Sequence, residues 1–144
     1  KEILGQDPRF TIVRSQSGDF TRAKGKEVME AFLKAEGPGG IDVLFAHNDD
    51  MAIGVMEAIS AAGRDKEMWI VGGAGMKEII KRIMDKDPQL PVNVTYPPAL
   101  ISSAIEMTAL RFVSNAPMAG RYIIGSQLIT PENAAQFYFP DSPF

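Results

Sequence analysis

Three times along the chain, a short apolar run typical of a β-strand is followed by a segment whose apolar residues have helical spacing. The strand-type runs are 10–13, 41–46 and 68–71, and the helical stripes that follow them are Val28/Ala31/Phe32/Ala35, Ala52/Val55/Met56/Ile59 and Ile79/Ile80/Ile83/Met84. Strands that alternate with crossover helices pair in parallel through right-handed connections. We therefore expect an α/β fold with an open, mostly parallel sheet and helices on both faces, a three-layer αβα arrangement. The near-continuous apolar run 41–46 predicts a strand buried on both faces.

The rhythm changes after Pro88. One more strand is expected over 90–95, and Tyr96-Pro97-Pro98 ends it. The helix predicted over 99–114 is apolar around most of its circumference, so it needs more than one partner surface. In the tail, 122–124 resembles a strand, and Thr130-Pro131 predicts a helix start.

Composition excludes several classes of function. The 144 residues suit one domain, and 15 Lys+Arg against 18 Asp+Glu, with the basic residues scattered, argue against a nucleic-acid partner. The chain has no Cys and a single His, His47, and it lacks a G-x-S-x-G motif and zinc-ligand spacing. No cofactor, metal or catalytic residue is therefore expected, and an enzyme is the third-ranked interpretation.

In an open α/β sheet, ligands bind beyond the carboxyl ends of the strands, so the residues that follow each strand are the candidates. Phe20 predicts either a core aromatic or a platform for the apolar face of a ligand, and burial is the commoner outcome for an isolated aromatic. Asn48 offers the donor and acceptor that a polyol hydroxyl needs, and it equally predicts a helix cap; the two roles are compatible. After Gly73 and Gly75, Glu78 breaks the G-x-G-x-x-G spacing, which argues against a dinucleotide site.

The blocks 16–25 (QSGDFTRAKG), 46–54 (AHNDDMAIG) and 70–72 (IVG) resemble the C-terminal half of periplasmic sugar-binding proteins of ABC importers, in the type I ribose/galactose/galactofuranose-binding branch. The resemblance implies two α/β lobes joined by three crossing segments, with a sugar trapped between them. It also implies that Phe20 stacks on the sugar and that Asn48 binds its hydroxyls, with Asp19 and Asp49 as further candidate ligand-binding residues.

Two positions depart from the family pattern. The acidic residue of the family's V-G-x-D-G turn is Ala74 here, and the usual Gln near the last crossing is Tyr96. A charged acceptor contributes strongly to the orientation of a polyol. We therefore expect a ligand other than ribose or galactose, with contacts to Tyr96.

The resemblance implies a division into the core of the C-terminal lobe (1–96), a hinge crossing and helix (97–115), and a return segment and tail (116–144). We expect a fragment that lacks the N-terminal lobe and one strand-helix unit, so that the helix 99–114 pairs with a second copy or another surface. The implied function is the non-catalytic, sugar-binding component of an ABC importer, exported to the periplasm with its signal peptide absent here and docking on a membrane permease. The alternative is the effector-binding domain of a sugar-responsive transcription repressor.

Overall fold

The computed structural model describes residues 2–115 and 117–144; Lys1 and Ala116, where the predicted segments 1–96 and 116–144 begin, lie outside the described residues. The chain forms two compact units, Lys1–Val71 and Gly72–Phe144. Four strands follow one another in the sheet in the order β1-β2-β3-β4. The expected α/β fold with a mostly parallel sheet and helices is confirmed.

The first unit contains a 3-10 turn (η1, Leu4–Gln6), helices α1 (Arg22–Ala35) and α2 (Asp49–Ala61), strand β1 (Val43–Phe45) and the first half of β2 (Trp69–Ala74). β1 and β2 are parallel, with Val43 opposite Trp69 and Phe45 opposite Val71. Both helices begin at side-chain caps, and the one at Asn48 is predicted from the sequence. The Thr21 hydroxyl accepts a hydrogen bond from the Lys24 amide (3.2 Å), and the Asn48 side chain accepts one from the Met51 amide (2.8 Å).

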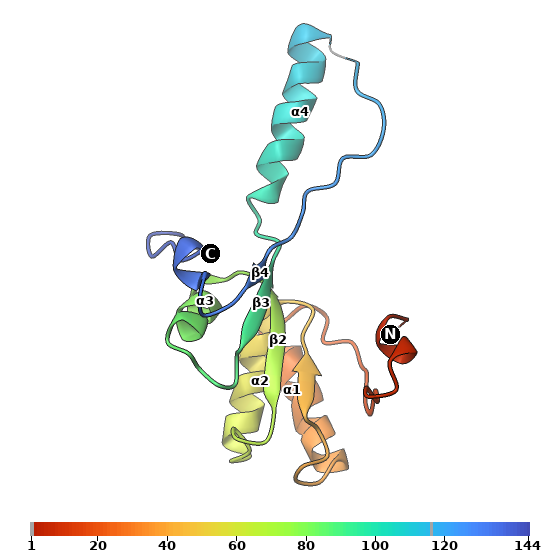
Figure 1. The fold of residues 1–144 in the computed structure, drawn as a ribbon, viewed down its shortest axis with the longest axis vertical. Helices are drawn as coiled ribbons and strands as arrows, with labels where there is room; N and C mark the ends of the chain where they lie inside the picture. Colours follow the sequence, from red (N-terminus) through yellow and green to blue (C-terminus); the bar gives the residue numbers. More distant parts are fainter. Residues whose placement is uncertain (1, 116) are drawn as a thin grey trace. The chain divides into compact units, whose positions relative to one another are not determined.

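Helices α1 and α2 lie side by side (Figure 1), and two glycines allow their backbones to approach closely. A Cβ added at Gly54 would lie 2.0 Å from the Arg22 carbonyl oxygen, and one added at Gly25 would lie 2.8 Å from the Met51 carbonyl oxygen. Both contacts are with backbone atoms, which cannot rotate away. The core beside this crossing includes Met29 and Ile59, which are fully buried.

The second unit contains the rest of β2, α3 (Lys77–Met84), β3 (Val92–Thr95), α4 (Leu100–Ser114), β4 (Leu128–Ile129) and a second 3-10 turn (η2, Ala134–Gln136). β3 and β4 are antiparallel, with Asn93 opposite Ile129. Of the stripe predicted for α3, Ile79, Ile80 and Ile83 are fully buried and Met84 is partly buried. In contrast, α4 has no buried residue, although it forms where the sequence predicts it.

The structure contradicts the strand expectations for three segments, 10–13, 41–46 and 122–124. Residues 10–13 form no strand, and Phe10, Ile12 and Val13 are about half exposed. A strand exists only through its pairing, and no described strand pairs with this segment. β1 is shorter than the apolar run 41–46 and is not buried on both faces, since Val43 and Phe45 are 40% and 59% exposed.

In the tail, residues 122–124 form no strand, and Tyr122, Ile123 and Ile124 are exposed. The helix start predicted at Thr130 leads only to the short turn η2. Among the described residues, no helix combines the length and the apolar character that a membrane crossing requires.

Candidate functional site

A strained turn precedes α1. The Thr21 amide donates a hydrogen bond to the Gly18 carbonyl oxygen (3.1 Å), and the two central residues, Asp19 and Phe20, have φ angles of 49° and 56°. Positive φ at both central positions is the type I′ pattern, which favours Gly, Asn and Asp. Asp19 suits this pattern, whereas for Phe20 the left-handed conformation costs about 1–2 kcal/mol. Strain of this kind concentrates at functional sites.

Phe20 is not a core residue, because the turn exposes it to solvent. Its side chain is 67% exposed, on a turn that lies immediately before a helix. Asp19 is exposed as well, and its carboxylate accepts a hydrogen bond from the Ser17 hydroxyl (2.8 Å). The Asp19 amide donates back to the same hydroxyl oxygen (3.2 Å). The turn thus presents an aromatic ring and a carboxylate side by side to solvent.

Asn48 joins this turn to the start of α2. Its Nδ2 donates to the Phe20 carbonyl oxygen (3.0 Å), while its Oδ1 accepts from the Met51 amide (2.8 Å). A side-chain amide has two N–H groups and two oxygen lone pairs. One of each is used in these bonds, and the other N–H and the other lone pair take no part in them. The two roles expected of Asn48, cap and ligand contact, are compatible in this geometry.

A hollow of about 350 Å³ opens between this turn and the end of β1. Its rim carries the turn residues 15–20 together with Phe45 and His47, whose rings meet edge to face with their centroids 4.9 Å apart. Sequence reasoning missed Phe45, because an apolar strand predicts burial. Its place at the carboxyl end of β1 was the available signal, since ligands gather there.

Asp49 is fully buried at the first position of α2, whereas Asp19 and Phe20 are exposed. Neither Asn48 nor Asp49 is among the residues that line the hollow, although their neighbour His47 is. Asp50, which follows Asp49, forms an exposed ion pair with Arg22 (3.3 Å). Carboxylates in the first turn of a helix interact favourably with the positive end of the helix dipole, so Asp49 and Asp50 have a structural role at the start of α2.

Ala74 and Tyr96 belong to the second unit, where the structure brings them together. The Tyr96 amide donates to the Ala74 carbonyl oxygen (3.3 Å), and Ala74 itself has a φ of 124°. A Cβ added at Gly73 would lie 2.9 Å from Cε1 of Tyr96, so the ring lies against the Gly73 backbone. Tyr96 remains 40% exposed. The aromatic ring therefore lies over the turn in which the family pattern has an acidic residue.

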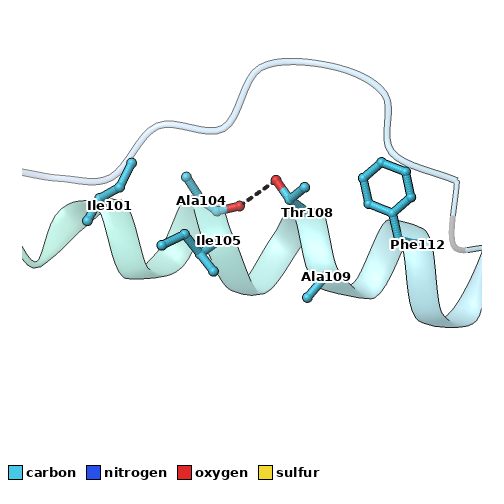
Figure 2. A pocket seen from close by; sticks show the side chains of 6 residues that line it. All are labelled: Ile101, Ala104, Ile105, Thr108, Ala109 and Phe112. Atoms are coloured by element: carbon cyan, nitrogen blue, oxygen red, sulfur yellow. Dashed lines mark hydrogen bonds between the residues drawn. The ribbon is translucent and has the colours of Figure 1, made fainter.

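The second unit also carries an apolar groove of about 410 Å³ along α4 (Figure 2), lined by Ile101, Ala104, Ile105, Thr108, Ala109 and Phe112. The Thr108 hydroxyl donates to the Ala104 carbonyl oxygen (2.7 Å), so the one polar side chain of the groove is engaged within the helix. Such a surface suits a protein contact better than a polyol. Within residues 2–115 and 117–144, no group of His, Asp and Glu side chains could hold a metal ion.

Comparison with known proteins adds relatives that share this architecture. The chain is 47% identical over 97 residues to the galactofuranose-binding protein YtfQ of Escherichia coli (strain K12), an alignment that covers 65% of this chain and 30% of that protein. It is 41% identical over 95 residues to the ribose import binding protein RbsB of Bacillus subtilis (strain 168), covering 66% of this chain and 29% of the relative.

Among solved structures, a galactofuranose binding protein superposes with a TM-score of 0.83 at 36% identity, covering 95% of this chain and 47% of the other. The periplasmic component of the arabinose ABC transporter from Shewanella sp. ANA-3, bound to α- and β-L-arabinofuranose, superposes with a TM-score of 0.81 at 35% identity, covering 95% of this chain and 45% of the other. The chain thus spans less than half the length of these proteins. The family described as periplasmic binding protein domain matches residues 1–116, and the chain belongs to this family.

Proposed function

We propose that the whole protein is the sugar-binding component of an ABC-type import system and that this chain is most of its C-terminal lobe. In this proposal, residues 1–96 form the core of the lobe, 97–115 a hinge crossing with its helix, and 116–144 the return segment and tail. The observation that carries it is the exposed ring of Phe20, held on a strained turn beside the amide of Asn48.

This arrangement suits the surface of a sugar. A monosaccharide has an apolar C–H face, which stacks on an aromatic ring, and hydroxyls that both donate and accept hydrogen bonds. The exposed face of Phe20 provides the stacking surface, and the second N–H and lone pair of Asn48 meet a hydroxyl. Asp19 and the Ser17 hydroxyl add polar groups at the rim of the hollow. Stacking and hydrogen bonding serve reversible binding, without bond chemistry.

The ligand is a monosaccharide, and Tyr96 contributes to its recognition. With Ala74 in the turn where the family has a carboxylate, the orientation of the sugar depends on other polar groups, and the partly exposed Tyr96 is next to this position. Relatives named for galactofuranose, arabinofuranose and ribose support a small sugar as the ligand class. These names also favour a transport receptor over the effector domain of a repressor. A location in the periplasm and a membrane permease as partner follow from the same proposal.

The exposed helix α4 is the basis of a further part of the proposal. Ile105, Leu110, Phe112 and Val113 are 59–87% exposed, which is more apolar surface than a stable monomer usually leaves open on one helix. We infer that the 144-residue chain, when it is alone, associates with a second copy through 99–114.

The test is calorimetric titration of galactofuranose, arabinose, ribose and galactose into the whole protein. We expect binding of at least one sugar, weakened about 10-fold or more by Phe20→Ala, because the stacking surface is lost. Phe139→Ala is the matched control, since Phe139 is similarly exposed (63%) but lies in the tail. Absence of binding by all four sugars, or equal effects of the two variants, would contradict the proposal.

A further inference from the structure

The conformation that presents Phe20 is unfavourable by itself. Asp19 and Phe20 are consecutive non-glycine residues at positive φ. In a free chain phenylalanine samples the left-handed region only rarely, and aspartate samples it more often but still as a minor state. The turn therefore needs contacts that favour this conformation over the more extended alternatives.

Two kinds of contact support the turn. The local ones are the hydrogen bond from the Thr21 amide to the Gly18 carbonyl and the mutual bonds of Ser17 and Asp19. All of these lie within residues 17–21, so they do not tie the turn to the rest of the unit. The bond from Asn48 Nδ2 to the Phe20 carbonyl comes from 28 positions further along the chain.

The Asn48 side chain that bonds to the turn also bonds to the start of α2. Asn48 Oδ1 accepts from the Met51 amide, so the amide group lies between α2 and the turn. Gly18 packs against the same helix, since a Cβ added there would lie 2.6 Å from the Met51 sulfur. The bridge needs a donor for the Phe20 carbonyl and an acceptor for the Met51 amide. An asparagine amide provides both in one planar group.

We propose that Asn48 is a positioning residue, whose amide holds Asp19 and Phe20 in the left-handed turn and thereby sets the place of the Phe20 ring. This inference rests on the proposed function for the role of the ring, and it adds to the direct contact of Asn48 with a sugar. The variant Asn48→Asp keeps the acceptor role of the side chain and removes its donor role. Aspartate caps a helix as well as asparagine does, but an ionised carboxylate cannot donate to the Phe20 carbonyl.

The first test needs no ligand. Hydrogen exchange of the whole protein is followed at the Thr21 amide, which closes the turn, and at the Met51 amide, which reports the cap. We expect Asn48→Asp to speed exchange at Thr21 by roughly 3- to 10-fold and to leave Met51 unchanged. Asn48→Ala, the matched variant without donor or acceptor, speeds both. Unchanged exchange at Thr21 in Asn48→Asp overturns the proposal, whatever the sugar result.

The second test measures affinity for whichever of the four sugars binds, in a double-mutant cycle of Asn48→Asp with Phe20→Ala. If Asn48 acts through Phe20 as well as by direct contact, its replacement weakens binding roughly 5-fold or more in the wild-type background and at least about 2-fold less than that in the Phe20→Ala background, where only the direct contact is lost. Equal effects in the two backgrounds overturn the positioning role for binding. If no sugar binds, the proposed function fails, and the exchange measurement alone decides whether Asn48 holds the turn.

Discussion

Replacing Gly54 by alanine tests the close crossing of α1 and α2. The new Cβ would lie 2.0 Å from the Arg22 carbonyl oxygen and 3.0 Å from the Lys26 amide nitrogen. Since Cβ contacts below 3.0 Å essentially do not occur, the two helices must separate by about 1 Å at this point. Such a gap forfeits a quarter to a half of the dispersion energy between the facing side chains.

Two opposing terms set the size of the effect. Glycine to alanine inside a helix normally stabilises by about 1 kcal/mol. Overpacking against a rigid neighbour destabilises by about 3 kcal/mol, the upper end of the usual range, because a backbone carbonyl cannot move alone. We therefore expect Gly54→Ala to lower the free energy of unfolding by about 2 kcal/mol. Without the clash, the same substitution would raise it, so the sign of the change is diagnostic.

The assay is urea unfolding of the 144-residue chain, followed by the fluorescence of Trp69, which is the single tryptophan and lies in the first unit. Gly37→Ala is the matched control, because a Cβ there meets nothing within 4 Å, and its stability should change by less than about 0.5 kcal/mol. A Gly54→Ala chain as stable as the wild type, or more stable, would refute the close backbone contact.

Two further predictions concern charge and association. The Glu67 carboxylate accepts hydrogen bonds from the Gly39 amide and from Arg64, and these hold the pKa of Glu67 below its ordinary value of 4.5. A lowered pKa means that the charged form of Glu67 stabilises the fold above pH 4.5 and that this contribution disappears as the pH falls through the folded-state pKa. In urea titrations between pH 6 and pH 3, the wild type should therefore lose more stability than Glu67→Gln. Equal losses in the two proteins would argue against the stabilising role of these hydrogen bonds. On α4, Ile105→Asp should shift the chain toward monomer in sedimentation velocity, whereas Ser102→Asp, the control on the same helix, should not, and a monomeric wild type would contradict association through this helix.

The positions of α1 to α4 were predictable because the signals of a helix are local, although Ala31 and Ala35 of the stripe predicted for α1 are exposed. Asn48 caps α2 as expected, and the stripe Ala52, Val55, Met56 and Ile59 is buried as the 3.6-residue period requires. Burial of a strand depends on its neighbours, which an apolar run does not encode. For that reason Phe45 is exposed despite the apolar run around it, and residues 10–13 are unpaired.

The candidate site was predictable by residue but not by geometry. Phe20 and Asn48 were singled out from their places after strands, yet neither glycine nor asparagine marks the positive φ angles at Asp19 and Phe20. Sequence rules for left-handed turns depend on glycine, asparagine and aspartate, so Asp19 is compatible with such a turn but nothing in the sequence marks the positive φ of Phe20. The bond between Asn48 and the Phe20 carbonyl joins positions 28 residues apart, and no local pattern predicts such a contact.

The close contact at Gly25 and Gly54 lies near the N-terminal ends of α1 and α2, the same ends that carry the turn and Asn48. Phe20 lies two residues before α1 and Asn48 one residue before α2, so the spacing of the two helices sets the gap that the amide must span. A displacement of about 1 Å, the size that one methyl group imposes at Gly54, is as large as the difference between a hydrogen bond and a missed one. Because Gly25 and Gly54 have no side chains, the first turns of the two helices are held at a fixed short distance. That distance determines whether Asn48 can reach the Phe20 carbonyl.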